Sequence, residues 1–276
     1  MSEYFGNKTY TLTFGDQAEN HAGMQKIGTP LQNGLTLKEL KKAKLKFENL
    51  GYVCYLHKMK CKEFLGEIFV IHKAYILIIK NGIEVLASGA SKASKNLKVS
   101  NNLHKKTFDE HNSMKYDKKA LMRGKVVNKI ARHNLCFANF SQKAEFSKGK
   151  GTIIDFNNLK YTNNIRKNLK KFFGKKASNL VAEGNYYYDN TKCGIGFHGD
   201  SERKIVIAIR LGRSMPIVFQ WYHKNKPVGK QKKFNIKGGD VYVMSEKAVG
   251  YDWKCSSKYT LRHAAGCNKY TTINKF

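Results

Sequence analysis

The sequence has little acidic charge, little proline and no long run of apolar residues. Only 20 Asp and Glu residues stand against 51 Lys and Arg residues among 276, which leaves a formal net charge of +31. No stretch approaches the roughly 18 apolar residues that a membrane-spanning helix needs. The N-terminus also lacks a basic segment followed by an apolar one, as a secretory signal would have. We therefore expect a soluble, intracellular protein.

Paired cysteine motifs are missing as well. The six cysteines form no CxxC pair. The segment CYLHKMKC (residues 54–61) places His57 between two cysteines, but no second pair completes a zinc-finger spacing. Cys255 and Cys267 flank His263 in the same incomplete way. We therefore expect reduced thiols in a reducing compartment rather than a zinc site or a disulfide framework.

The excess of positive charge is the strongest compositional signal. A chain this basic repels itself, and a polyanion is the commonest partner that offsets the repulsion. We expect electrostatic contact with nucleic acid, DNA or RNA. We expect no membrane partner, because no basic amphipathic helix with a strong apolar face stands out. The abundance of Lys, Asn and Ile also fits an AT-rich coding bias, as in a large DNA virus, whose protein would act in the nucleus or cytoplasm of an infected host.

The first part of the chain predicts a mixture of helix and strand. TLKELKKAKLKFENLG begins with Thr36, has Glu39 three residues later and ends at Gly51, which predicts a capped basic helix. Residues 67–80 and 83–89 are rich in β-branched residues, and Asn81-Gly82 between them predicts a type I′ hairpin. The polar, basic segment 89–119 is typical of a long surface loop.

The second part predicts a short strand, a helix and then six closely spaced strands. IIDF (153–156) is a strand candidate, and TNNIRKNLKKFFG (162–174) a helix that begins near Thr162 or Asn163 and ends at Gly174. The strand candidates that follow are 179–188, 204–212, 215–223, 232–236, 239–244 and 258–265. This order favours an α+β protein: an antiparallel sandwich or barrel over 116–276 with a helix outside, and a smaller basic α+β N-terminal extension over 1–115.

One short motif carries chemistry. In CGIGFHGDSERK (193–204), a single glycine separates His198 from Asp200. On a strand, residues i and i+2 point to the same face, so both side chains can reach one metal ion. A neutral imidazole and a carboxylate suit Fe(II), and a further ligand from another strand would complete a facial triad. The alternative is an ordinary polar turn between two strands.

The residues around this motif resemble those of a known family. NLVAEGNYYYDNTKCGIGFHGDSER resembles the AlkB-like branch of the 2-oxoglutarate/Fe(II)-dependent oxygenases, in which an Asn-x-Tyr strand precedes a motif that commonly reads Ile-Gly-x-His-x-Asp-x-Glu. Asn185 and Tyr187 match the first pattern, and residues 195–202 match the second. Downstream, KIVIAIRLG, MPIVFQW, GGDVYVM and YTLRHAAG resemble the family's later strands. The resemblance covers about residues 135–270.

The resemblance implies a double-stranded β-helix, or jelly-roll, core with flanking helices. It implies that His198 and Asp200 bind Fe(II) and that Asn185 and Tyr187 hydrogen-bond 2-oxoglutarate. Arg262 would pair with a carboxylate of 2-oxoglutarate, which the planar fork of arginine suits. The implied activity oxidises a C–H bond while 2-oxoglutarate is decarboxylated to succinate. With the net charge, it favours removal of N-alkyl groups from a nucleic-acid base that is flipped out or single-stranded.

The sequence departs from the family at two positions. The distal iron-binding histidine is expected 13 or 14 residues after Asp240, where this chain has Trp253 and Lys254. Three possibilities stay open for the third ligand: His263, Asp252 as a carboxylate substitute, or none. Against His263 stands its neighbour Arg262, because neighbours on a strand face opposite ways unless a bulge intervenes. His223 lies in a predicted hairpin tip and is therefore not a candidate for the third ligand. The family's first arginine falls on Ser256, and Lys254 or Lys258 could supply that charge.

Two other functions remain open. The chain could be a non-catalytic, basic nucleic-acid-binding protein on a degenerate oxygenase scaffold, in view of the two departures. It could also be an oxygenase that hydroxylates a protein side chain. The aromatic run Tyr186, Tyr187 and Tyr188 fits either stacking on a base or alternation between the core and the surface of a strand.

Overall fold

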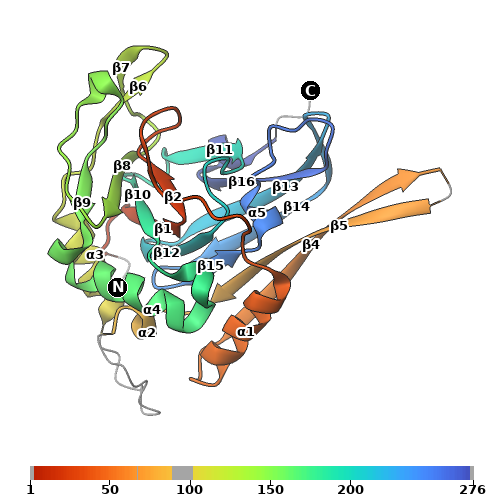
Figure 1. Ribbon diagram of the computed structural model, residues 1–276, viewed down its shortest axis with the longest axis horizontal. Coiled ribbons are helices and arrows are strands. Elements are labelled where there is room, and N and C mark those ends of the chain that lie inside the picture. The colour runs from red at the N-terminus through yellow and green to blue at the C-terminus, as the bar shows by residue number, and fades with distance from the viewer. Residues whose placement is uncertain (1–2, 67, 89–101, 274–276) are drawn as a thin grey trace.

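The computed structural model describes residues 3–66, 68–88 and 102–273, and it shows a mixed α+β protein in which sheet predominates (Figure 1). The larger sheet has eight strands in the order β4-β5-β15-β12-β1-β10-β8-β9. Their bounds are β1 (Thr9–Gly15), β4 (Cys54–Leu65), β5 (Ile68–Ile79), β8 (His133–Ala138), β9 (Ile153–Asp155), β10 (Val181–Tyr187), β12 (Val206–Gly212) and β15 (Val241–Met244).

The smaller sheet has four antiparallel strands in the order β11-β16-β13-β14. They are β11 (Gly194–His198), β13 (Met215–His223), β14 (Lys226–Ile236) and β16 (Thr260–Gly266). Two small hairpins join β2 (Gln17–Glu19) to β3 (Lys26–Gly28) and β6 (Lys119–Met122) to β7 (Lys125–Asn128). The helices are α1 (Leu37–Glu48), α2 (Ile83–Leu86), α3 (Leu103–Asn112), α4 (Lys160–Phe173), α5 (Glu246–Val249) and α6 (Asn268–Thr271).

The elements stack in three layers, because the large sheet is apolar on both faces. One face packs on α1–α4 through a core that joins Phe14 and Ile209 of the sheet to Leu40 of α1 and Leu169 of α4. The other face packs on the small sheet through a second core, which includes Ala208, Tyr242, Phe219, Trp221 and Leu261. The space between the two sheets also holds the polar side chains described below.

Most of the predicted elements are confirmed. The helix α1 begins after Thr36 with the predicted capping box, in which Thr36 and Glu39 cap each other. The strands predicted after residue 179 correspond to β10, β12, β13, β14, β15 and β16. Helix α4 ends at Gly174 as predicted but starts two residues earlier, at Lys160. Its buried residues Ile165, Leu169 and Phe172 follow the helical repeat that directs one face to a core.

Two local predictions are wrong. Residues 83–86 form the short helix α2 instead of a strand, because Asn81 has a φ of 53° but Gly82 has a φ of −60°. A type I′ hairpin needs a positive φ at both positions. The hairpin partner of β5 is instead β4. Within the predicted loop 89–119, residues 103–112 form α3, and 89–101 lie outside the described residues.

The large sheet crosses the domain boundary that the sequence places near residue 115. Strand β1 lies between β10 and β12 and is antiparallel to both, while β5 pairs with β15. The N-terminal third therefore supplies a central strand and one end of the sheet. In the described part of the chain, no helix is both long and apolar enough to cross a membrane.

Candidate metal centre

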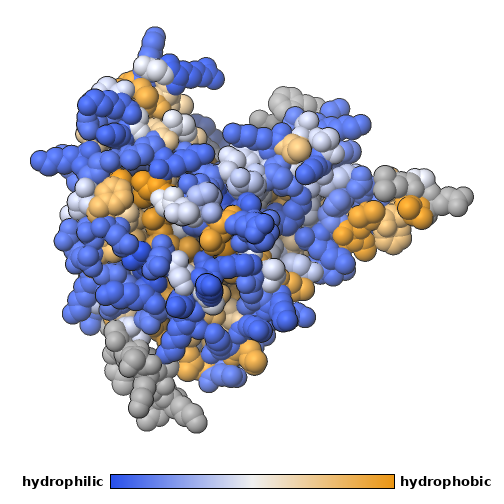
Figure 2. All heavy atoms as spheres, in the orientation of Figure 1, coloured by the Kyte–Doolittle hydropathy of each residue, from blue (hydrophilic) through white to orange (hydrophobic). Residues whose placement is uncertain are grey.

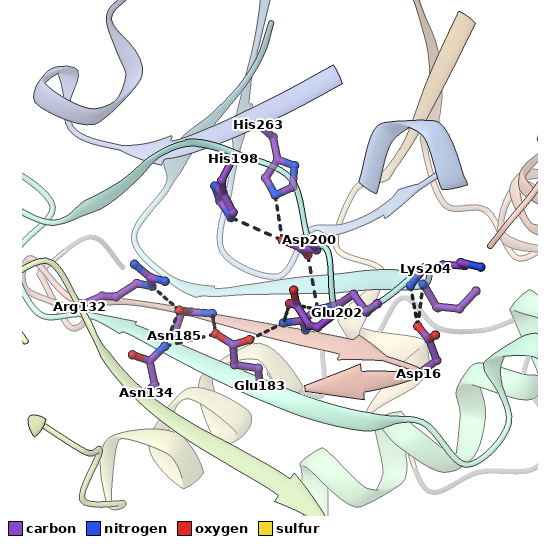
Figure 3. Close-up of polar contacts among 12 residues, drawn as sticks. Asp16, Arg132, Asn134, Glu183, Asn185, His198, Asp200, Glu202, Lys204 and His263 are labelled. Carbon is purple, nitrogen blue, oxygen red and sulfur yellow. Dashed lines mark hydrogen bonds and ion pairs between the residues drawn. The ribbon is translucent and has the colours of Figure 1, made fainter. Parts of the chain in front are cut away.

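Three potential metal ligands converge between the two sheets. The side chains of His198, Asp200 and His263 each offer one ligand atom, and these atoms all lie within 4.8 Å of one another. Nε2 of His198 is 3.5 Å and Nε2 of His263 is 3.6 Å from Oδ1 of Asp200 (Figure 3). Among the described residues, this is the cluster of His, Cys, Asp and Glu with metal-binding geometry. Two imidazoles and one carboxylate form the donor set of a facial triad.

Strand pairing and a close backbone approach bring these residues together. His198 is paired with His263 across β11 and β16, after an irregularity in the pairing between Ile195 and His198. Asp200 follows directly, and its backbone N–H donates to the carbonyl of Val249 at 3.0 Å. A Cβ atom on the intervening Gly199 would lie 2.1 Å from the carbonyl oxygen of Gly250. Only glycine at position 199 therefore allows the backbone to approach Gly250 this closely.

The electrostatic surroundings keep Asp200 charged and His263 neutral. Burial alone would raise the pKa of the Asp200 carboxyl, but the positive charge of Arg203 and the nearby imidazoles of His198 and His263 hold that pKa well below its usual range. Burial lowers the pKa of His263, and His198 lowers it further. A carboxylate beside a neutral imidazole is the protonation state that metal ligation requires.

A chain of buried polar contacts links Asp200 to residues of β10. Nε of Arg203 lies 3.5 Å from the Asp200 carboxylate, and its Nη2 donates to Glu183 at 2.5 Å and to Glu202 at 2.6 Å. Glu183 in turn accepts from Nδ2 of Asn185 at 2.9 Å. Figure 3 shows this chain running from the metal cluster along β10. The matched position Asn185 is thus linked to Asp200 through two intermediate side chains.

The structure shows where the alternative candidates for the third ligand lie. His263 faces the cluster and is 7% exposed, with its Nδ1 unpaired among the described residues. Asp252 lies elsewhere and pairs with Lys247 at 2.7 Å. His223 ends β13 at the turn into β14 and stacks on Tyr259, as its predicted hairpin position suggests.

Arg262 does not join the other predicted site residues. Its guanidinium lies 4.2 Å from the ring centroid of Tyr222 and 5.2 Å from that of Trp253, and it donates to Asn225. Neighbouring residues of a strand point to opposite faces. Because His263 points toward the cluster, Arg262 points away from it.

The sequence reasoning missed a buried cation, Arg210 of β12. Its side chain is fully buried, its Nη1 donates to the Thr11 hydroxyl, and its Nε and Nη2 have no partner among the described residues. Thr11 of β1 pairs with Asn185 on one side and with Arg210 on the other. Directly paired residues share a face of the sheet, so Asn185, Thr11 and Arg210 form one polar row.

Tyr242 of β15 is a further buried polar residue between the two sheets. Burial raises the pKa of Tyr242 to about 12. Sequence offered one signal for Arg210: an arginine within the otherwise apolar strand KIVIAIRLG, where a charge needs a partner.

The fold and the site define a sheet-rich α+β protein with a His/Asp/His cluster, in which Asp200 and His263 are buried and His198 is partly exposed. No family model matches the chain. A protein of Acanthamoeba polyphaga mimivirus with the name "Uncharacterized protein R156" is 41% identical over 266 residues, which cover 95% of this chain and 97% of that protein. The chain belongs to the same family as this mimivirus protein, in agreement with the viral coding bias of its composition.

Proposed function

We propose that this protein is an Fe(II)- and 2-oxoglutarate-dependent oxygenase of AlkB-like type that acts on nucleic acid. The observation that carries the proposal is the convergence of His198, Asp200 and His263, with their ligand atoms within 4.8 Å. A pair of imidazole nitrogens and one carboxylate oxygen leave the remaining coordination positions open, which suits Fe(II) in oxygenases. The placement of His263 in the cluster supports it as the third ligand over Asp252.

The topology supports a jelly roll as the core. A jelly roll has eight strands in two sheets. The central strands β15-β12-β1-β10 of the large sheet and the strands β11-β16-β13-β14 of the small sheet supply two such sets of four, and both sets are antiparallel. The N-terminal strand β1 completes the first set in this arrangement.

The polar row supports an anionic cosubstrate such as 2-oxoglutarate. A buried guanidinium with unpaired donors is costly unless an anion meets it, and its fork fits a carboxylate with two parallel hydrogen bonds. In the proposal, Arg210 takes the role that the resemblance gave to Arg262. Asn185 and Tyr187 lie on the same strand, β10, beside Thr11 and Thr9 of β1.

The protein's own groups then have separate tasks. His198, Asp200 and His263 would hold the metal, Arg203 fixes the Asp200 carboxylate, and Arg210 would orient the cosubstrate. Fe(II) and 2-oxoglutarate, when bound, supply the activation of dioxygen. Asp200, His263, Arg203 and Arg210 are buried, whereas His198 is partly exposed, which leaves the metal position accessible from one side. The net charge of +31 supports a nucleic-acid substrate over a protein side chain.

Anaerobic titration with Fe(II) and 2-oxoglutarate tests the proposal. We expect a weak visible charge-transfer band that is absent in His198→Ala, and aerobic succinate release that an N-methylated single-stranded oligonucleotide stimulates. No band at saturating metal, with nucleic acid still bound, would identify a non-catalytic binding protein on an oxygenase-like scaffold. A band with succinate release stimulated only by a protein substrate would identify a protein hydroxylase.

A further inference from the structure

The strands β4 and β5 form a long hairpin that projects from the body of the protein (Figure 1). Its base continues the large sheet beside β15, and its far end has no packing partner among the described elements. Figure 2 shows hydrophilic side chains near the body and hydrophobic side chains toward the far end. The two faces of this hairpin differ in chemistry.

One face of the hairpin carries a strip of lysines, here called the lysine face: Lys58, Lys60, Lys62 and Lys73. Lys60 and Lys73 are paired directly across the strands, with Lys58 and Lys62 two residues to either side. Like charges in such positions repel each other. Around Lys58 the repulsion adds to desolvation in lowering the ammonium pKa. No described residue on this face, over 56–64 and 69–77, is acidic.

The lysine face ends in an aromatic pair. Phe64 and Phe69 are paired across the strands on the same face, with ring centroids 6.5 Å apart. Phe64 is 74% exposed, Ile68 67% and Phe69 52%. Lysines on an edge strand can serve simply to block aggregation. That role does not account for exposed phenylalanines at the tip, which would promote aggregation.

The opposite face has a different character. There Met59 and Cys61 pack into the core between the sheets, and Glu63 accepts a 2.7 Å hydrogen bond from His72. The positive charge is therefore confined to one side of the hairpin. A loop that enters a membrane would place its cations around the tip, whereas a one-sided strip fits a linear polyanion that lies along it.

A cavity lies at the base of the hairpin, on the side that faces the small sheet. It has a volume of about 270 Å³ and is lined by Met59, Lys60, Phe219, Trp221, Lys230, Lys232 and Leu261. Met59 belongs to the face opposite the lysine strip and packs into the core between the sheets. The cavity and the lysine face therefore lie on different sides of the hairpin, and the binding surface inferred below consists of the lysine face and its aromatic pair.

We infer that the lysine face and the aromatic tip of the β4–β5 hairpin bind single-stranded nucleic acid. The lysines neutralise successive phosphates, and Phe64 and Phe69 stack on exposed bases, as in other single-strand-binding surfaces. The inference deepens the proposed function, on which it rests for the chemistry that follows binding. In this arrangement the hairpin holds the strand, and the metal cluster supplies the chemistry.

Fluorescence anisotropy with a labelled single-stranded DNA oligonucleotide, in the absence of iron and 2-oxoglutarate, tests the inference. Lys58→Gln/Lys60→Gln/Lys62→Gln should weaken binding about tenfold or more and reduce the salt slope of log K by about 2. Phe64→Ala/Phe69→Ala should weaken binding about fivefold or more for each ring lost, with an unchanged salt slope. Both sets of substitutions are exposed and should leave the thermal unfolding midpoint within a few degrees of the parent protein's.

The matched control removes the same charge from the exposed face of α1, as Lys38→Gln/Lys41→Gln/Lys42→Gln. Equal losses in the two lysine variants, or unchanged affinity in both hairpin variants, would overturn the inference. So would hairpin variants that lose binding to phosphatidylserine vesicles but not to the oligonucleotide. Hairpin-dependent binding without the anaerobic charge-transfer band would overturn the oxygenase proposal alone. A normal band with hairpin-independent binding would overturn only this inference.

Discussion

His263 and Arg262 are consecutive residues of β16, and their side chains lie on opposite faces of the strand. Nε2 of His263 is 3.6 Å from the Asp200 carboxylate, whereas the Arg262 guanidinium stacks on Tyr222. The pairing of β16 with β13 is regular through both residues. Since side chains alternate along a regular strand, His263 points toward the candidate metal cluster and Arg262 points to the opposite face of β16.

Removing the His263 imidazole should abolish metal binding. The variant His263→Ala loses one of three ligand atoms, and we expect Fe(II) affinity to fall by at least about 100-fold, since removing a residue that only orients a metal ligand already costs about 10–100-fold. Asp252→Asn is the matched control, because Asp252 pairs with Lys247 outside the cluster. Equilibrium titration with Fe(II) under anaerobic conditions measures both. Loss of affinity in Asp252→Asn but not in His263→Ala would assign the third ligand to Asp252.

Replacing Arg210 should raise the stability of the ligand-free protein and weaken its binding of 2-oxoglutarate. Arg210→Met removes a buried charge with two unpaired donors, so we expect the ligand-free protein to gain about 1 kcal/mol of unfolding free energy. The same variant should bind 2-oxoglutarate roughly 10- to 150-fold more weakly, the value of a charge-assisted hydrogen bond. Arg262→Gln should change 2-oxoglutarate affinity less than about twofold. A less stable Arg210→Met protein with unchanged 2-oxoglutarate affinity would give Arg210 a purely structural role.

The sequence predicted the second half of the fold well because its strands are local and regular. Five of the six strands predicted after residue 179 lie within about two residues of their predicted bounds, because they are separated by turn residues. The exceptions are β14, which begins at Lys226 and not at residue 232, and β11, which was not among the predicted strands. The hairpin at Asn81-Gly82 failed for the opposite reason. The dipeptide permits a type I′ turn, but Gly82 has helical backbone angles and begins α2 instead, which no local pattern distinguishes from the turn.

The candidate site was predictable only where a motif is contiguous. His198 and Asp200 are two residues apart, so spacing alone places them together. The choice between His263 and Asp252 depends on strand register, and the position of Arg210 depends on β1, which pairs with β12 across almost 200 residues of sequence. No local sequence pattern indicates that pairing, so residues 9–15 were predicted to belong to a separate N-terminal extension over 1–115.

Gly199 should be irreplaceable, whereas Gly196 should tolerate a side chain. A Cβ at Gly199 would lie 2.1 Å from the Gly250 carbonyl oxygen, while a Cβ at Gly196 meets nothing within 4 Å. We expect Gly199→Ala to lose about 2–4 kcal/mol of unfolding free energy and to weaken Fe(II) binding. Gly196→Ala should stay within about 0.5 kcal/mol of the parent protein. Urea denaturation measures both, and equal effects would contradict the close approach at Gly199.

Acid should destabilise the protein through His111. This imidazole is fully buried between Tyr116 and Thr162, and burial lowers its pKa to about 3. The folded state therefore resists a proton that the unfolded chain accepts below about pH 6.5. Unfolding free energy should fall with pH from about 6.5 toward 5, with up to about 1.4 kcal/mol per pH unit from this residue. His111→Gln should reduce that slope, whereas His223→Gln at the β13–β14 turn should preserve it. Identical slopes in the parent and His111→Gln would contradict the assignment.

The segment 116–276 should not fold alone, although the sequence resemblance lies entirely within it. Without residues 1–115, β1 is lost from between β10 and β12, and both strands expose a row of unpaired backbone groups and a strip of the core. Thr11 also leaves the polar row, so the Arg210 guanidinium loses the hydrogen bond to the Thr11 hydroxyl. We expect this fragment to aggregate or to show no cooperative thermal transition by circular dichroism, in contrast to the full chain. Adding back residues 1–35 as a peptide, which restores β1, should recover part of the soluble fraction. A cooperative transition in the fragment alone would mean that β10 and β12 close on each other without β1.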